Sequence, residues 1–171
     1  AVALREAASK GVEVRAASVA VSGNGVATIE KADVPVDFAP VASVDADSGV
    51  YLLLLPLTEE SELSVGSLGT YRFEAGYYLY VGSGKKNLTA RIRRHLGKRK
   101  RMHWHIDYLR ARSAAPQAFP IYTLEDLECE LAGDLSRIYR APVERFGSSD
   151  CRCHTHLFYA PRDPRKERAF V

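Results

Sequence analysis

Aromatic hydroxyls and guanidinium groups stand close together in the middle of this sequence. The segment GYYLYVGSG (residues 76–84) contains three tyrosines and runs directly into KKNLTARIRRHLGKRKR (85–101). Hydroxyl groups on a strand can position a water molecule, and arginines on the following helix can neutralise a phosphate. The pattern therefore indicates a site that cleaves phosphodiesters or, more simply, aromatic packing beside a solvated helix.

The charge is distributed unevenly along the chain. Residues 1–80 carry five basic and eleven acidic side chains, whereas residues 84–112 carry eleven basic side chains and one acid, Asp107. Such a block favours a polyanionic partner, DNA or RNA, over a merely solvated lysine-rich face. The side chains expected to contact a nucleic-acid backbone are Lys85, Lys86, Arg94, Lys98, Arg99, Lys100 and Arg101.

Composition limits the class of protein. A length of 171 residues suits one domain, or one domain with an appendage, and the 46% of apolar residues is enough for a hydrophobic core. No run of about 18 apolar residues could cross a bilayer, and the start AVALREAASK lacks a signal-peptide pattern. Three cysteines do not form a framework of paired disulfides. We expect a cytoplasmic protein with no membrane partner and no small-molecule cofactor.

Three parts are expected along the chain. Residues 1–47 form an appendage with a short helix (3–11) and a β-hairpin around a Ser-Gly-Asn-Gly turn, followed by a Pro- and Asp-containing linker (35–49). Residues 48–160 form the main domain, and residues 161–171 form a polar tail.

Hydrophobic periodicity predicts an α/β fold for the main domain. Strands are expected at 49–57, 76–82 and near 156–159, and helices at 88–96, 103–112 and 125–140. Residues 61–76 read as a loop or edge hairpin. Residues 115–124 read as an extended, proline-marked connection that holds one short strand.

Helical geometry separates the cations of residues 88–96 into two groups. The apolar stripe of this helix consists of Leu88, Ile92 and Leu96. Arg91 and His95 are i,i+4 neighbours on the border of that stripe, so both can reach the sheet. Arg94 points away, toward solvent or a nucleic-acid backbone.

A similar argument selects one acid in the helix expected at 125–140. Its core-facing stripe consists of Leu124, Leu127, Leu131, Leu135 and Ile138. Glu128 falls inside this stripe, whereas Glu130 lies at its side. A carboxylate in that position needs a cationic partner or a metal, and the sequence alone leaves both open.

These motifs together resemble the GIY-YIG nuclease superfamily and, more closely, its Uri-type endonuclease branch. The resemblance rests on GVY (49–51), YVG (80–82), ARIRRH (90–95), ECELA (128–132) and FGSSDCRCHTHLFY (146–159), and covers about residues 48–160. It implies a small α/β domain around a three-stranded, mainly antiparallel sheet flanked by helices. It also implies hydrolysis of DNA phosphodiester bonds with one divalent metal ion, Mg²⁺ or Mn²⁺.

The resemblance also implies roles for individual residues. Tyr51 and Tyr80 lie near the attacking water, and Arg91 contacts the scissile phosphate. His95 is a hydrogen-bond donor or acid–base partner, and Glu128 is the metal ligand. Many relatives carry an asparagine downstream of the glutamate, whereas this chain has only Asn24 and Asn87, so Asp150 is a candidate substitute. The alternative function is a non-catalytic nucleic-acid-binding module of the same fold.

Two further motifs permit more than one interpretation. The CRCHTH segment places Cys151, Cys153, His154 and His156 close together, but an extended strand would point the cysteines away from the histidines. A turn, together with Cys129, could bring them to one zinc ion. We favour buried thiols beside a hydrogen-bonded histidine over zinc at Cys151, Cys153 and His156, and rank a structural zinc domain as a third alternative.

The HWHIDYL segment (103–109) is divided in the same way. Trp104 and Tyr108 are expected to pack in the core as an i,i+4 pair, and His103 and Asp107 to pair on the surface. His105 is a further candidate for the phosphate site.

The N-terminal segment has a resemblance of its own. Residues 3–38 resemble the C-terminal end of sugar fermentation stimulation proteins, a family linked to DNA binding. The resemblance covers only the last stretch of that family and implies no defined role for the appendage.

Overall fold

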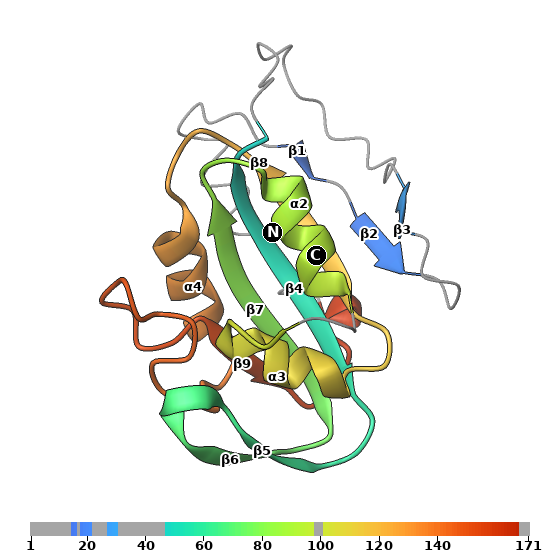
Figure 1. Cartoon of the computed structure of the whole chain (residues 1–171), viewed down its shortest axis with the longest axis vertical. Coiled ribbons are helices and arrows are strands. Elements are labelled where there is room, and N and C mark those ends of the chain that lie inside the picture. Colours follow the sequence, from blue (N-terminus) through green and yellow to red (C-terminus); the bar gives the residue numbers. More distant parts are fainter. Residues whose placement is uncertain (1–14, 17, 22–26, 31–46, 98–100, 168–171) are drawn as a thin grey trace.

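The centre of the protein is one antiparallel sheet, seen in a computed structural model that describes residues 15–16, 18–21, 27–30, 47–97 and 101–167 (Figure 1). The strands follow the order β3-β2-β8-β4-β7-β9, and β1 also pairs with β8. Their bounds are β1 Arg15–Ala16, β2 Ser18–Val21, β3 Ala27–Glu30, β4 Gly49–Leu57, β7 Gly76–Gly84, β8 Gln117–Tyr122 and β9 Leu157–Ala160.

The remaining elements lie around this sheet. Strands β5 (Ser61–Ser64) and β6 (Thr70–Phe73) form a hairpin. A loop or an edge hairpin was expected here, and the hairpin is a separate two-stranded sheet. The helices are α2 (Leu88–Leu96), α3 (His105–Arg112) and α4 (Glu128–Ser136), with short 3-10 turns at Gly66–Leu68 and Pro164–Lys166. Within the described ranges, no helix has the length and apolar character needed to cross a membrane.

Two hydrophobic cores lie on opposite faces of the sheet. On one face, Tyr51 and Leu53 of β4 and Tyr78 and Tyr80 of β7 pack with residues of α2 and α3. The alternate residues of the same two strands pack against α4 on the other face. The unbroken apolar run of β4 is thus explained, because both faces of this strand are buried.

The main domain contributes four strands to the central sheet, not the three that were expected. Strand β8 pairs with β4 from Gly49↔Tyr122 to Leu54↔Gln117, in the segment that was expected to be an extended connection holding one short strand. Pro120 lies within this strand and has no N–H to donate. Among the described residues, β1 pairs with Ile121 and Tyr122 and β2 with Gln117 and Ala118, so none of these pairs involves Pro120.

The predicted N-terminal hairpin is confirmed in its strands. β2 and β3 pair antiparallel from Ser18↔Glu30 to Val21↔Ala27, and β2 extends the sheet by pairing with β8. The turn at 22–26, the helix expected at 3–11 and most of the expected linker lie outside the described residues.

The predicted helix 88–96 is confirmed, and its stripe of Leu88, Ile92 and Leu96 is buried. α4 is shorter than expected, because the Thr123 hydroxyl accepts from the Glu125 N–H and holds a turn where the helix was predicted to begin.

The predicted apolar stripe of this helix was therefore wrong at both ends. Leu124 is 78% exposed and Ile138 is 40% exposed, whereas Leu135, in the middle, is buried.

Candidate functional site

The two motif tyrosines face the same side of the sheet, toward α2. Tyr51 is 1% exposed and Tyr80 is 6% exposed. Both rings lie near the imidazole of His95, with ring centroids 5.8 Å and 6.5 Å away respectively. The structure thus brings together three of the predicted site residues, from β4, β7 and α2.

Two glycines make room for these rings. Gly82 lies directly across the β4–β7 ladder from Tyr51, and a methyl group there would come within 3.0 Å of the Tyr51 ring and hydroxyl. Gly147, at φ +74°, lies under Tyr80, whose Cε2 would be 2.6 Å from an added Cβ. Each tyrosine therefore occupies space that any other residue at these glycine positions would fill.

The pKa of the Tyr51 hydroxyl reflects both the guanidinium and the carboxylate of the predicted site. Burial raises the pKa of Tyr51 well above its ordinary value. The Arg91 charge and a hydrogen bond with Arg91 act in the opposite direction, and the charge of Glu128 raises the pKa further. Tyr51 consequently stays protonated at neutral pH and acts as a hydrogen-bonding group rather than as a phenolate base.

Tyr80 has similar surroundings. Burial raises its pKa most, followed by the effects of Tyr51 and Glu128, whereas Arg91 lowers it. The charge of Asp150 makes a smaller contribution. Asp150 is exposed, and its effect on the Tyr80 hydroxyl is smaller than those of Tyr51 and Glu128.

Arg91 also contacts an aromatic ring. Its guanidinium carbon lies 5.2 Å from the centre of the Trp104 ring, within the range of a cation–π interaction. Trp104 is 38% exposed, so the prediction that it packs in the core was wrong. It immediately precedes α3, whose buried residues begin with Ile106, and this leaves its ring at the surface.

His95 belongs to a buried polar group that the sequence did not predict. Asp107 is fully buried, and its Oδ1 lies 3.6 Å from His95 Nδ1. Its Oδ2 accepts from Arg94 Nη2 at 2.9 Å and from the backbone N–H groups of His103 and Trp104 at 3.0 Å.

Two expectations about this helix junction are therefore corrected. Asp107 is an interior N-terminal cap of α3, not half of a surface pair with the His103 side chain. Arg94 does not point away into solvent, because it pairs with that buried carboxylate and donates to the Arg101 carbonyl.

Glu128 reaches the site around an open edge of the sheet. It is the first residue of α4, and its side chain is 21% exposed. Strand β9 stops pairing at Tyr80↔Leu157, so the last residues of β7 have no strand on that side. There the Ser83 hydroxyl donates to Glu128 Oε2, and His156 Nδ1 lies 3.2 Å from Oε1.

His105 lies at the margin of the site. Its Nδ1 accepts from the Gly147 N–H at 3.2 Å, and its ring packs 5.6 Å from that of Phe146. Burial lowers its pKa, which favours the neutral imidazole that this hydrogen bond needs. The contact links His105 to the glycine that makes room for Tyr80.

The cysteine-rich segment is not an extended strand, contrary to one of the alternatives considered. Residues 151–156 form a bent loop, and β9 begins only at Leu157. Cys129 of α4 joins Cys151, Cys153 and His156, and the ligand atoms of these four residues all lie within 4.8 Å of one another. His154 is excluded, since its side chain is 62% exposed and lies toward Glu144.

The basic block is partly used inside the protein. Arg110 is 2% exposed and donates to the carbonyls of Leu96 and Ser113, the ends of α2 and α3. Lys85, Lys86 and Arg101 are exposed, although Lys85 lies 3.8 Å from Asp126. The expected backbone contacts Lys98, Arg99 and Lys100 lie outside the described residues.

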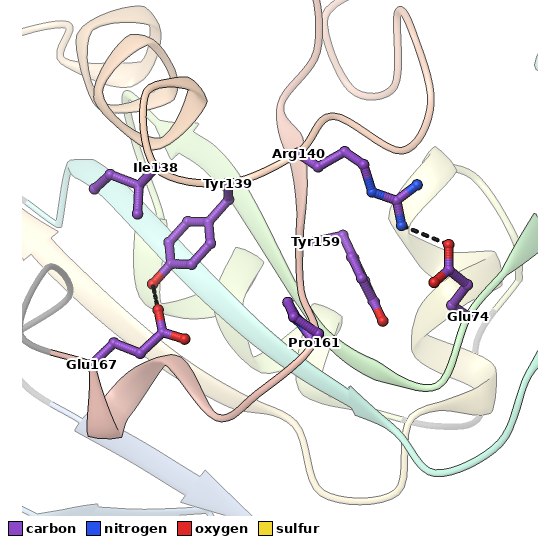
Figure 2. Close-up of a pocket in the computed structure, with 7 residues that line it drawn as sticks. All are labelled: Glu74, Ile138, Tyr139, Arg140, Tyr159, Pro161 and Glu167. Atoms are coloured by element: carbon purple, nitrogen blue, oxygen red, sulfur yellow. Dashed lines mark hydrogen bonds and ion pairs between the residues drawn. The ribbon is translucent and has the colours of Figure 1, made fainter.

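A shallow pocket of about 570 Å³ lies apart from these residues, beside β9 (Figure 2). Its polar groups pair with one another, Arg140 with Glu74 and the Tyr139 hydroxyl with Glu167, and the Arg140 guanidinium lies over the Tyr159 ring. No predicted site residue lines it. The full lining is Glu74, Ile138, Tyr139, Arg140, Tyr159, Pro161 and Glu167.

Sequence reasoning missed the residues that hold the site in shape. Ser83, His156 and Asp107 each touch a predicted site residue from an element remote in sequence. Asp107 had a signal, because it is the one acid in the basic block. Ser83 and His156 had none that periodicity reveals.

Comparison with known proteins identifies a family but no function. A family model described as a domain of unknown function, DUF123, matches residues 50–171. This is nearly the same part of the chain as the GIY-YIG resemblance, and it excludes the N-terminal appendage. No curated protein and no solved structure matches the chain. The chain therefore belongs to the DUF123 family.

Proposed function

We propose that this protein is a GIY-YIG-type endonuclease of the Uri branch, which hydrolyses DNA phosphodiester bonds with one Mg²⁺ or Mn²⁺ ion. The observation that carries the proposal is the surroundings of one hydroxyl. The buried Tyr51 ring lies 5.8 Å from the His95 ring, and the charges of Arg91 and Glu128 both act on the pKa of its hydroxyl, so groups from β4, α2 and α4 act at one place. A plain packed tyrosine would not need both charges beside it.

The donor set suits a hard divalent cation. Glu128 offers a partly exposed carboxylate, and hard cations prefer oxygen ligands completed by water and phosphate. The hydroxyl of Ser83 and the ring of His156 orient this carboxylate. A bound Mg²⁺ or Mn²⁺ ion would stabilise negative charge on the phosphate oxygens.

The other residues divide the remaining work. Arg91 binds the scissile phosphate through its guanidinium. On binding, phosphate oxygens replace the Trp104 ring or the Tyr51 hydroxyl as neighbours of the guanidinium. The neutral phenols of Tyr51 and Tyr80 position the attacking water by hydrogen bonding. His95, whose Nδ1 lies 3.6 Å from Asp107 Oδ1, is the candidate for proton transfer.

The second candidate is a module that binds DNA without cutting it. Both oxygens of Glu128 already have protein partners, Ser83 and His156. The downstream asparagine of related nucleases is also absent from the sequence. A phosphate bound by Arg91 and the exposed cations would then be held but not attacked.

Cleavage assays on linear, nicked, branched and single-stranded DNA test the proposal. The wild-type protein should cut at least one substrate with Mg²⁺ or Mn²⁺ and none with chelator. Arg91→Ala should lower the rate by about 10²–10³-fold, as expected for a residue that stabilises developing charge. Arg93→Ala is the matched control, because Arg93 is an exposed arginine of the same helix, and its effect should be far smaller.

The outcomes separate the two candidates. Salt-sensitive binding of DNA without cleavage of any substrate would favour the binding module. Equal losses of activity in the Arg91 and Arg93 variants would contradict the assigned role of Arg91.

A further inference from the structure

Three cysteines and one histidine gather between the start of α4 and the loop before β9, next to β7. Cys151, Cys153 and His156 come from the loop before β9, and Cys129 comes from the first turn of α4. His156 is 1% exposed, Cys151 and Cys153 are half-buried, and Cys129 is exposed. No residue of this cluster is assigned a catalytic or metal-binding role in the proposed nuclease.

The backbone holds this loop firmly around the cluster. The His156 N–H donates to the Phe146 carbonyl, and the His156 carbonyl accepts from the Val81 N–H. The Arg145 guanidinium donates to the carbonyls of Cys151 and Cys153. These hydrogen bonds fix the turn that brings the two thiols and the imidazole together.

Distances in the cluster match tetrahedral coordination. Zn–S bonds of about 2.3 Å and Zn–N bonds of about 2.0–2.1 Å place a sulfur and a nitrogen ligand roughly 3.5 Å apart. Cys151 Sγ and His156 Nε2 lie 3.4 Å apart, and all four ligand atoms lie within 4.8 Å of one another. A disulfide would pair only two of the three cysteines and leave one thiol unused. One zinc ion would bind all three thiols.

From this geometry we propose a structural Zn²⁺ site formed by Cys129, Cys151, Cys153 and His156. Four protein ligands leave no open position, which is typical of structural rather than catalytic zinc. The soft thiolate ligands select zinc over the hard cation proposed for Glu128. The ion would tie the start of α4 to the loop before β9, two segments that no strand pairing connects.

The site has a consequence for Glu128, and this part rests on the proposed function. When Nε2 of His156 binds zinc, its Nδ1 carries the proton and donates to Glu128 Oε1, 3.2 Å away. Zinc-binding histidines usually have such a carboxylate partner. The zinc would therefore hold, through His156, the carboxylate that binds Mg²⁺ in the proposed nuclease, with His156 as a positioning residue.

Metal analysis of the wild-type chain tests the site directly. Protein purified without chelators, and the same protein denatured and refolded with Zn²⁺, should contain about one zinc per chain by mass spectrometry of the elements. Replacement by Co²⁺ should give the absorption bands of tetrahedral thiolate coordination. Chelation should lower the midpoint of thermal unfolding, because structural zinc contributes to folding.

Variants locate the ligands. Cys153→Ser should lose the ion, whereas His154→Asn, which changes the exposed neighbouring histidine, should retain it. Glu128→Gln should keep the cobalt spectrum but bind the metal about 10–100-fold more weakly, as expected for a carboxylate behind a histidine ligand.

One result would overturn the zinc site even if the Cys153 variant failed to fold. Wild-type protein that takes up no zinc and has three thiols freely reactive in the native state would exclude it. Zinc content is measured without DNA, so a zinc-bound protein that cuts nothing would refute the nuclease proposal alone. A zinc-free protein that cuts DNA would refute only the zinc site.

Discussion

Gly82→Ala tests the packing on which the candidate site depends. Gly82 lies across the ladder from Tyr51, and an alanine methyl would meet the Tyr51 ring closer than real Cβ atoms approach other atoms. Tyr51 is 1% exposed, so the ring cannot swing into solvent. It has to retreat by about 1 Å within a packed core, and such overpacking costs roughly 1–3 kcal/mol.

Gly133→Ala is the matched control for this change. Gly133 lies within α4, and an added methyl there has no heavy atom within 4 Å. Both substitutions remove similar backbone entropy from the unfolded chain, worth about 0.5–1 kcal/mol of stabilisation. The difference between the two variants therefore isolates the contact with Tyr51.

The assay is thermal unfolding followed by circular dichroism. Gly82→Ala should unfold below Gly133→Ala by about 2–12 °C, from roughly 2–4 °C per kcal/mol for a chain of this size. A displacement of about 1 Å at Tyr51 should also slow DNA cleavage by roughly 10²-fold if the proposed function is right. Equal midpoints for the two alanine variants would refute the placement of Tyr51 over Gly82.

Three further predictions follow from other contacts. Asp107→Ala should lower the free energy of unfolding by about 2–4 kcal/mol in denaturant titration, because it leaves the Arg94 charge and two backbone N–H donors without their acceptor. Asp126→Ala, which removes an exposed carboxylate 3.8 Å from Lys85, should leave the free energy of unfolding nearly unchanged. Trp104 is the one tryptophan of the sequence, and its fluorescence should change when DNA binds. Arg91→Ala should abolish that change, and an unchanged response in the variant would contradict the Arg91–Trp104 contact. The free energy of unfolding should fall above about pH 10. Tyrosines of the unfolded chain ionise near their ordinary pKa of about 10, whereas burial raises the pKa of Tyr51 and Tyr80 and keeps both protonated in the folded protein. A free energy of unfolding that is independent of pH between 9 and about 11.5 would contradict the raised pKa values.

Local patterns predicted the elements that carry the site. Residues 88–96 form the expected helix with Arg91 and His95 on its sheet-facing border, because the i,i+4 spacing of its apolar residues allows one orientation. Alternation along β7 likewise accounts for Tyr78 and Tyr80 sharing one face, which packs against α2 in the structure. Short-range periodicity was sufficient wherever one face of an element is clearly apolar.

Contacts between distant segments could not be predicted in this way. The partners of Glu128 come from residues 45 and 28 positions away, and the choice depends on where β9 stops pairing with β7. Arg94 was expected at the surface because its helical angle points away from the sheet, but α3 supplies a buried carboxylate on that side. Periodicity describes one element and contains no information about what packs against its other face.

The central claim is that Glu128 supports DNA hydrolysis, and one paired measurement tests it most directly. Cleavage and equilibrium binding of the best DNA substrate are measured for Glu128→Gln, with Glu125→Gln, an exposed glutamate three residues earlier, as control. The amide retains the size of the side chain and an acceptor for one of its two partners, Ser83 or His156. Our account predicts loss of cleavage with DNA binding retained in Glu128→Gln, and no loss in Glu125→Gln. Wild-type rates of cleavage by Glu128→Gln in Mg²⁺ would contradict it.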